Sequence, residues 1–363
     1  MLAAARQESA LIAAVVAAAV AYGLEPRLLG NGRATAATAA AVLIAAILLA
    51  SVRVAHHATR IARQLGDPYG TMVLTLSAVL VEVLILGIMM ANATSPTLVR
   101  DTIYSAVMLD INGILGLATL MGGLKHGEQA YNDDSGRTYG VMILTAMSIS
   151  MVVPEFVPRH LWHVYSGFTI IAMVTLYAGF LRMQTGPHSY FFSYSYPGRS
   201  RRPTASEEEE ERPGRLRPAA LLVGGIVVIG ALAEIMSRTL DVGLRGSGAP
   251  PALLAILVAT ISAGPEILTA LRAALANRMQ SVVNIAMGAS LSTVILTVPA
   301  MEALALYTGQ PFQMAMTPVQ TVMVFVTLIA AAINLNDGQT NAIEGMTHFV
   351  LFATFLVLSA LGM

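Results

Sequence analysis

Apolar residues run along this chain in long stretches, and polar residues gather in short segments between them. About 20 apolar residues are needed for an α-helix to cross the hydrocarbon core of a bilayer. Eleven such stretches are present, which predicts an all-α polytopic membrane protein embedded in a lipid bilayer. They lie near residues 10–29, 34–54, 70–92, 102–122, 139–157, 163–183, 218–237, 250–276, 280–300, 314–334 and 345–362.

The longest polar segment, residues 184–217, divides the predicted spans into six and five. It is rich in Pro, Ser, Arg and Glu, and two interpretations are open. It is either a solvated tether or an acidic patch that concentrates cations at a cytoplasmic mouth. The acidic run consists of Glu207, Glu208, Glu209, Glu210 and Glu211. The predicted organisation is an N-terminal transmembrane helix (1–30), a first five-helix repeat (31–183), the linker (184–217) and a second five-helix repeat (218–363).

The basic residues are distributed unequally between the two sides of the predicted membrane. Fifteen of the 21 Lys and Arg residues fall on the side that holds the N-terminus. The positive-inside rule therefore predicts a cytoplasmic N-terminus and a periplasmic C-terminus. The Arg- and Ala-rich composition is typical of a GC-rich bacterial gene, which favours the bacterial inner membrane.

Composition also limits the partners and cofactors of the protein. The formal net charge is zero, so nothing points to a nucleic-acid partner, and the oligomeric state is left open. The chain has no cysteine, which excludes disulfides and thiolate metal sites. No resident cofactor is expected.

Two glutamates lie deep inside apolar spans, away from the span ends. Glu82 is near the middle of the third span, and Glu266 lies beyond the middle of the eighth. A charged side chain at that depth costs about 2.5–3.5 kcal/mol on insertion scales, so each glutamate is by default a functional-site hypothesis. The alternative is a protonated acid that is hydrogen-bonded between helices.

The segments around these glutamates resemble each other. The sequence ISAGPEI at 261–267 echoes LSAVLVEV at 76–83, and the next span in each half carries polar residues on an apolar background. The two segments are five spans apart and so cross the membrane in opposite directions, as in secondary transporters that bind substrate where inverted repeats meet. The residues expected to line this site are Ser77, Asp110, Asn112, Ser262, Gly264, Pro265, Ser290 and Ser292.

The predicted site has the chemistry of a cation site. Gly264 and Pro265 should break the helix and free carbonyl oxygens beside Glu266. Carboxylate, carbonyl, amide and hydroxyl oxygens suit a hard cation such as Ca²⁺ or Na⁺, so Glu82 and Glu266 are the predicted metal ligands, with the cation as substrate. Burial favours a protonated carboxyl, so protons and cations compete for the same oxygens and their gradients become coupled. The sequence predicts an antiporter that exports Ca²⁺, or alternatively Na⁺ or K⁺, in exchange for protons by alternating access.

Intramembrane acids also occur in two other classes of protein. A cation channel with the same intramembrane acids is the alternative that remains open. An intramembrane enzyme is disfavoured, because the chain has no HExxH, no GxSxG and no P-loop. The missing P-loop also excludes a recognisable ATP-driven pump.

Several segments resemble the cation/proton exchanger family of the calcium/cation antiporter superfamily, and most closely its bacterial calcium, sodium or potassium/proton antiporter branch. The most specific is DGQTNAIEG at 337–345, which is similar to the family's Asp-Gly-x-Ser/Thr-Asn-x-x-Glu-Gly signature. The resemblance implies one helix before two inverted five-helix repeats, in which Glu82 and Glu266 bind the cation and exchange protons. It further implies that Asn112 and Ser292 line the site, and that Glu234, Asp337, Asn341 and Glu344 lie at an entrance or gate. The other matching segments are residues 62–70, 100–108, 112–113, 122–129, 233–236 and 264–266.

The chain departs from the family pattern in the first repeat. Members of the family often place Gly-Asn-Ala before their acids, whereas Val79, Leu80 and Val81 precede Glu82 here. No helix break is therefore expected beside Glu82.

Overall fold

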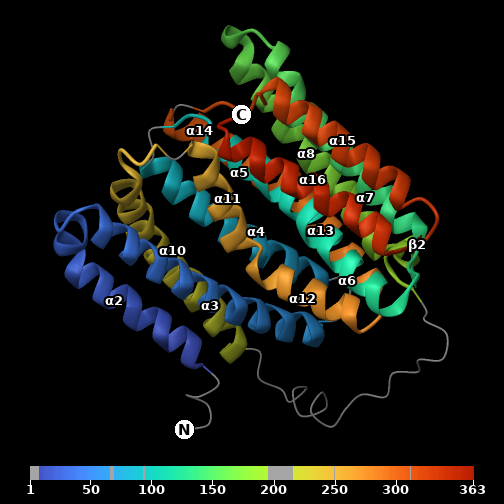
Figure 1. Cartoon of the computed structure of the whole chain (residues 1–363), viewed down its shortest axis with the longest axis horizontal. Coiled ribbons are helices and arrows are strands. Elements are labelled where there is room, and N and C mark those ends of the chain that lie inside the picture. The colour runs from blue at the N-terminus through green and yellow to red at the C-terminus, as the bar shows by residue number, and fades with distance from the viewer. Residues whose placement is uncertain (1–7, 66–68, 93–94, 195–215, 249, 311) are drawn as a thin grey trace. The chain divides into compact units, whose positions relative to one another are not determined.

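The computed structural model of the 363-residue chain describes residues 8–65, 69–92, 95–194, 216–248, 250–310 and 312–363. The chain forms two compact units (Figure 1). Unit 1 combines Met1–Asn92 with Ser195–Ser247, and unit 2 combines Ala93–Tyr194 with Gly248–Met363. This division differs from the repeats expected from sequence, whose boundaries remain a prediction. The acidic run at 207–211 lies outside the described residues.

Unit 1 is a bundle of long apolar helices in which α10 packs against the other three. Small residues allow close contact: the backbone of Ala37 lies 3.0 Å from the position that a Cβ on Gly243 would take. Close approach of small residues is typical of packing between membrane helices. The helices are α2 (Ser9–Gly30), α3 (Arg33–Leu65), α4 (Tyr69–Asn92) and α10 (Leu216–Leu244).

A charged cluster fastens the start of α2 to α3. Arg53 donates to the Glu8 carboxylate from Nε at 2.9 Å and from Nη2 at 2.7 Å, and His57 Nε2 lies 3.1 Å from the same group. The hydrogen bond from Arg53 is the largest cause that lowers the pKa of Glu8 to about 2. Glu8 is therefore ionised, and holds this contact, across the physiological pH range.

Unit 2 contains helices interrupted by short π and 3-10 segments. Two of its spans, Leu98–His126 and Met279–Thr308, are continuous helices with a π-helical turn inside. Its elements are α5 (Leu98–Met108), η1 (Leu109–Leu115), α6 (Gly116–His126), β1 (Gln129–Ala130), α7 (Asp133–Met147), η2 (Ser148–Val152), η3 (Val153–Phe156), η4 (Arg159–Leu161), α8 (Trp162–Thr185), η5 (Ser189–Phe192), α11 (Pro251–Ser262), α12 (Gly264–Leu275), α13 (Met279–Ser292), η6 (Thr293–Thr297), α14 (Val298–Thr308), α15 (Pro318–Asn334), β2 (Gln339–Thr340) and α16 (Ala342–Ala360).

The helices account for the predicted spans. Within the described ranges, nine helices are long and apolar enough to cross a membrane, and the bent pair α11 and α12 makes a tenth span. The shorter apolar helix α15, with 17 residues, falls where the sequence predicts the remaining span. The prediction of an all-α polytopic membrane protein is confirmed.

Loops that follow alternate spans meet at opposite ends of unit 2. At one end β1 pairs antiparallel with β2, with Gln129 opposite Thr340, and Gln129 Nε2 donates to the Ala274 carbonyl at 3.0 Å. At the other end the backbone N–H of Gln313 donates to the Pro96 carbonyl at 2.9 Å. If successive spans cross the membrane in opposite directions, the loops that hold β1 and β2 must lie on one side and the segments at Pro96 and Gln313 on the other, as observed.

Helices α6 and α16 approach each other through glycines. A Cβ on Gly345 would collide with the backbone of Leu120, and one on Gly123 would collide with the backbone of Ala342. A Cβ on Gly116 would lie 2.9 Å from the backbone nitrogen of Phe349. Only glycine permits this contact, which fixes α16 against the helix that continues from η1.

We expect Gly345→Ala to destabilise unit 2, because the added methyl group has no room without a backbone shift. Overpacking of this kind costs about 1–3 kcal/mol. The measurement is the unfolding temperature of the detergent-purified protein. The matched control is Gly179→Ala in α8, where no atom lies within 4 Å of the added Cβ. Equal unfolding temperatures for the two variants would contradict the proposed role of the glycine contact.

Candidate cation site

Glu82 lies in an unbroken stretch of α4 in unit 1. The residue is 7% exposed, and its neighbours Ile85 and Leu86 are fully buried. The helix continues from Tyr69 to Asn92 through this point, as Val79, Leu80 and Val81 led us to expect. The Glu82 carboxyl is therefore buried beside backbone groups that belong to a continuous helix.

Glu266 lies directly after a helix break in unit 2. Helix α11 ends at Ser262, α12 begins at Gly264, and the two axes meet at 61° (Figure 1). The break falls where Gly264 and Pro265 predicted it, and Pro265 has no N–H to donate to the Ile261 carbonyl. Glu266 occupies the first turn of α12, where the helix dipole favours a negative charge.

The π-turn η1 carries two further predicted site residues, Asp110 and Asn112. Both are buried, with exposed fractions of 2% and 0%. Helices α12, α13, α15 and α16 all pack against η1. Unit 2 thus brings the helix that bears Glu266 into contact with the segment that bears Asp110 and Asn112. π-turns inside α-helices are frequent at functional sites.

Each of these polar side chains on η1 contacts a different helix. Ser290 Oγ on α13 donates to Asp110 Oδ2 at 3.2 Å. Asn112 Nδ2 donates to Thr327 Oγ1 on α15 at 2.7 Å, and Asn112 Oδ1 lies 2.9 Å from His348 Nδ1 on α16. Neither Thr327 nor His348 was predicted from the sequence to lie at the site. An imidazole inside the apolar last span was the available signal for His348.

The other predicted serines form hydrogen bonds within their own helices. Ser77 Oγ donates to the Val73 carbonyl at 2.6 Å, Ser262 Oγ to Ala259 at 2.9 Å, and Ser292 Oγ to Gly288 at 2.7 Å. Because a hydroxyl that donates still has lone pairs, these oxygens can also ligate a cation. Their place in a cation site remains a prediction.

The signature at 337–345 builds the turn before α16 and caps that helix. Asp337 Oδ1 accepts from the backbone N–H two residues later at 3.1 Å, and Gly338 has a φ of +76°. Asn341 Oδ1 accepts from the backbone N–H of Glu344 at 3.2 Å, and Asn341 Nδ2 donates to the Glu344 carboxylate at 2.9 Å. These contacts explain the residue types structurally, and an entrance or gating role for them remains a prediction.

Glu234 belongs to a polar cluster that joins α10 to α2 in unit 1. Tyr22 Oη donates to Glu234 Oε2 at 2.8 Å, and Arg238 binds Glu234 at 2.7 Å and Glu25 at 2.6 Å. Glu234 therefore helps to attach the N-terminal helix. Its predicted place at an entrance is not tested by these contacts.

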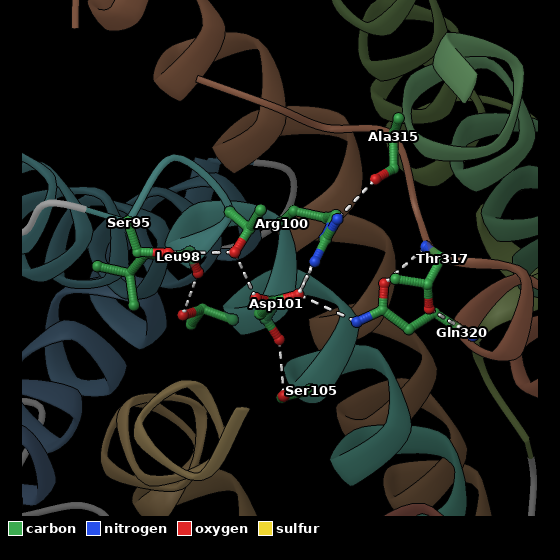
Figure 2. Close-up of polar contacts among 10 residues, drawn as sticks. Ser95, Leu98, Arg100, Asp101, Ser105, Ala315, Thr317 and Gln320 are labelled. Atoms are coloured by element: carbon green, nitrogen blue, oxygen red, sulfur yellow. Dashed lines mark hydrogen bonds and ion pairs between the residues drawn. The ribbon is translucent and has the colours of Figure 1, made fainter. Parts of the chain in front are cut away.

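A buried ion pair lies at the start of α5 (Figure 2). Arg100 donates to Asp101 Oδ1 from Nε at 2.9 Å and from Nη2 at 2.7 Å. Arg100 also donates to the Ala315 carbonyl at 2.9 Å, and Gln320 Nε2 donates to Asp101 Oδ1 at 3.0 Å. Arg100 is only 8% exposed. The pair fixes α5, and hence η1, to the start of α15.

The ligands available to a cation are limited. Across the described ranges, no group of three or more His, Asp or Glu side chains is placed to hold a metal ion. A cation at Glu82 or Glu266 would therefore take most of its ligands from neutral carbonyl, amide and hydroxyl oxygens.

The structure has the features of a secondary transporter: apolar helices with buried carboxylates, a broken helix and polar π-turns. The chain belongs to the sodium/calcium exchanger protein family, whose model matches residues 35–186 and 217–361. This membership confirms the resemblance recognised from sequence and places the protein among transporters.

The chain is similar to proteins of known name over most of its length. It is 31% identical to the sodium-potassium/proton antiporter ChaA of Escherichia coli, with 86% of each chain covered. It is 30% identical to the putative ionic transporter y4hA of Sinorhizobium fredii, covering 88% of this chain and 87% of y4hA. The crystal structure of the Ca²⁺/H⁺ antiporter protein YfkE matches with a TM-score of 0.76 at 17% identity, covering 98% of this chain and 99% of YfkE, which supports the fold.

We expect Arg100→Met to destabilise the protein strongly, because it leaves Asp101 charged and buried. Breaking a buried ion pair costs about 3–5 kcal/mol. The double variant Arg100→Met with Asp101→Asn should recover part of the lost unfolding temperature, because no uncompensated charge remains. The control is Arg245→Met, whose exposed pair with Asp241 is worth about 0–1 kcal/mol. A double variant less stable than Arg100→Met alone would contradict this account.

Proposed function

We propose that this protein is a secondary-active antiporter that exchanges cations for protons across the bacterial inner membrane. The observation that carries the proposal is the pair of glutamates in apolar spans, Glu82 within α4 and Glu266 at the α11–α12 break. The relatives named as sodium-potassium/proton and Ca²⁺/H⁺ antiporters support the same activity.

Competition between protons and cations at each carboxylate couples the two fluxes. A carboxylate removed from water is costly as a free anion, so it holds either a proton or a share of a cation. When access alternates between the two sides, a cation released outside is replaced by protons, which are released in turn on the cytoplasmic side. The proton gradient then drives cation export.

The proposed substrates are Ca²⁺, Na⁺ and K⁺. Ca²⁺ takes about six to eight oxygen ligands. The break beside Glu266 frees a backbone carbonyl, whereas the unbroken α4 supplies none beside Glu82. With fewer carbonyl oxygens beside Glu82, the roughly six to eight oxygen ligands of Ca²⁺ are harder to supply, which favours acceptance of monovalent ions as well. The ChaA relative, named for sodium and potassium, supports their inclusion.

We place the end of unit 2 that holds β1 and β2 in the cytoplasm, together with the N-terminus and the linker at 184–217. The loops on that side carry fifteen of the 21 basic residues. The C-terminus is then periplasmic. The cation and the proton are substrates, and the proposal includes no resident cofactor and no nucleic-acid partner.

Dequenching of a pH-sensitive dye in everted vesicles tests the proposal. Ca²⁺, Na⁺ and K⁺ are added separately at several pH values. We expect at least one ion to release the proton gradient with the wild-type protein, and Glu82→Gln and Glu266→Gln to abolish this response, because glutamine keeps size and hydrogen bonding but cannot bind or release a proton.

The matched control is Glu302→Gln, which changes a glutamate of α14 that is 1% exposed and bonded to Ser166 Oγ at 3.3 Å. We expect this variant to retain exchange. Full activity in both site variants would falsify the assignment of Glu82 and Glu266. If a tracer shows ion flux and the dye shows no proton movement, the protein is instead a cation channel.

A further inference from the structure

His348 is a buried imidazole whose placement packing alone does not explain. The residue is 3% exposed in the N-terminal half of the apolar helix α16, and its Nε2 has no hydrogen-bond partner among the described residues. An unpaired buried polar atom costs free energy. An apolar side chain would fill the same space without that cost, so the ring must gain something from its other nitrogen.

The other nitrogen, Nδ1, lies 2.9 Å from Asn112 Oδ1. An amide oxygen can only accept a hydrogen bond, so Nδ1 carries the ring proton. The opposite end of the same amide is also occupied, because Asn112 Nδ2 donates to Thr327 Oγ1 at 2.7 Å. In this arrangement the Asn112 amide has a partner at each end, His348 at its oxygen and Thr327 at its NH₂ group.

The close contact between α6 and α16 makes this geometry possible. Gly116 follows Asn112 by one turn on the continuous η1–α6 helix, and a Cβ on Gly116 would lie 2.9 Å from the Cβ of His348. A larger residue at this position would move α16 away. The glycine therefore brings the imidazole within hydrogen-bond distance of the π-turn.

We propose that His348 is a positioning residue for cation binding, which holds the Asn112 amide so that its oxygen, and not its NH₂ group, is presented to the cation. A carbonyl oxygen has two lone pairs, so it can accept from His348 and ligate a cation at the same time. Without the imidazole, the amide turns and presents its donors to a positive charge. The proposal rests on the proposed function, since it requires a cation beside Asn112.

Two pairs of variants test the proposal. His348→Asn places an amide N–H near the position of Nδ1, whereas His348→Leu has the same number of heavy atoms and no donor. Thr327→Ser keeps the hydroxyl acceptor, and Thr327→Val removes it with little change in shape. The half-saturating concentration of Na⁺, K⁺ and Ca²⁺ is measured by dequenching in everted vesicles, and binding is measured by the shift that each ion causes in the unfolding temperature of the purified protein.

We expect His348→Leu to raise the half-saturating concentration by about five- to tenfold, which corresponds to the loss of one hydrogen bond, with little change in the maximal rate. The half-saturating concentration of His348→Asn should stay within about twofold of the wild-type value. Thr327→Val should have a higher half-saturating concentration than Thr327→Ser. In an Asn112→Ala background the difference between Leu and Asn at position 348 should vanish, because there is no amide left to orient. If His348→Leu fails to fold, the comparison of Thr327→Val with Thr327→Ser still tests whether the orientation of the Asn112 amide controls cation affinity.

Equal affinities for His348→Leu and His348→Asn would overturn the proposal, as would an undiminished difference between them in the Asn112→Ala background. These outcomes differ from failure of the proposed function. If the wild-type protein neither exchanges any of the three ions for protons nor is stabilised by them, cation exchange itself fails, and this inference fails with it.

Discussion

The contact between α6 and α16 through glycine is the constraint on which the organisation of unit 2 depends. Because Gly116, Gly123 and Gly345 carry no side chain, the two backbones approach closely enough to exclude any added methyl group. This contact fixes the capped turn before α16 and the pairing of β1 with β2 at one end. It also brings His348 to Asn112 in the interior.

The two halves of the chain both contain π-helical turns, but they differ at the segments that carry the glutamates. The spans that follow the glutamate-bearing segments each contain a π-helical turn, η1 in one and η6 in the other. The glutamate-bearing segments themselves differ, since α4 is continuous and the α11–α12 pair is bent by 61°. In an apolar bundle each irregular backbone group must find a partner inside the protein. Both of these π-turns carry buried polar side chains, Asp110 and Asn112 in η1 and Thr293 and Thr297 in η6.

Local chemistry made part of this structure predictable. The break before Glu266 follows from the missing N–H of Pro265, and the unbroken α4 follows from Val79, Leu80 and Val81. The π-turns could not be predicted in this way, because the residues of η1 suit an α-helix equally well and the insertion is accommodated by the helices around it. Contacts distant in sequence were missed for the same reason. His348 is 236 positions from Asn112, and Gln320 is 219 positions from Asp101.

In the proposed mechanism, the acids and the neutral side chains have different roles. Only a carboxylate such as Glu82 or Glu266 can exchange a proton for a cation, so the acids determine whether the fluxes are coupled. An amide such as Asn112 stays neutral, so its orientation changes the affinity for an ion without changing the number of protons moved. The choice of ion would depend on how firmly residues such as His348 and Thr327 hold the neutral ligands in place.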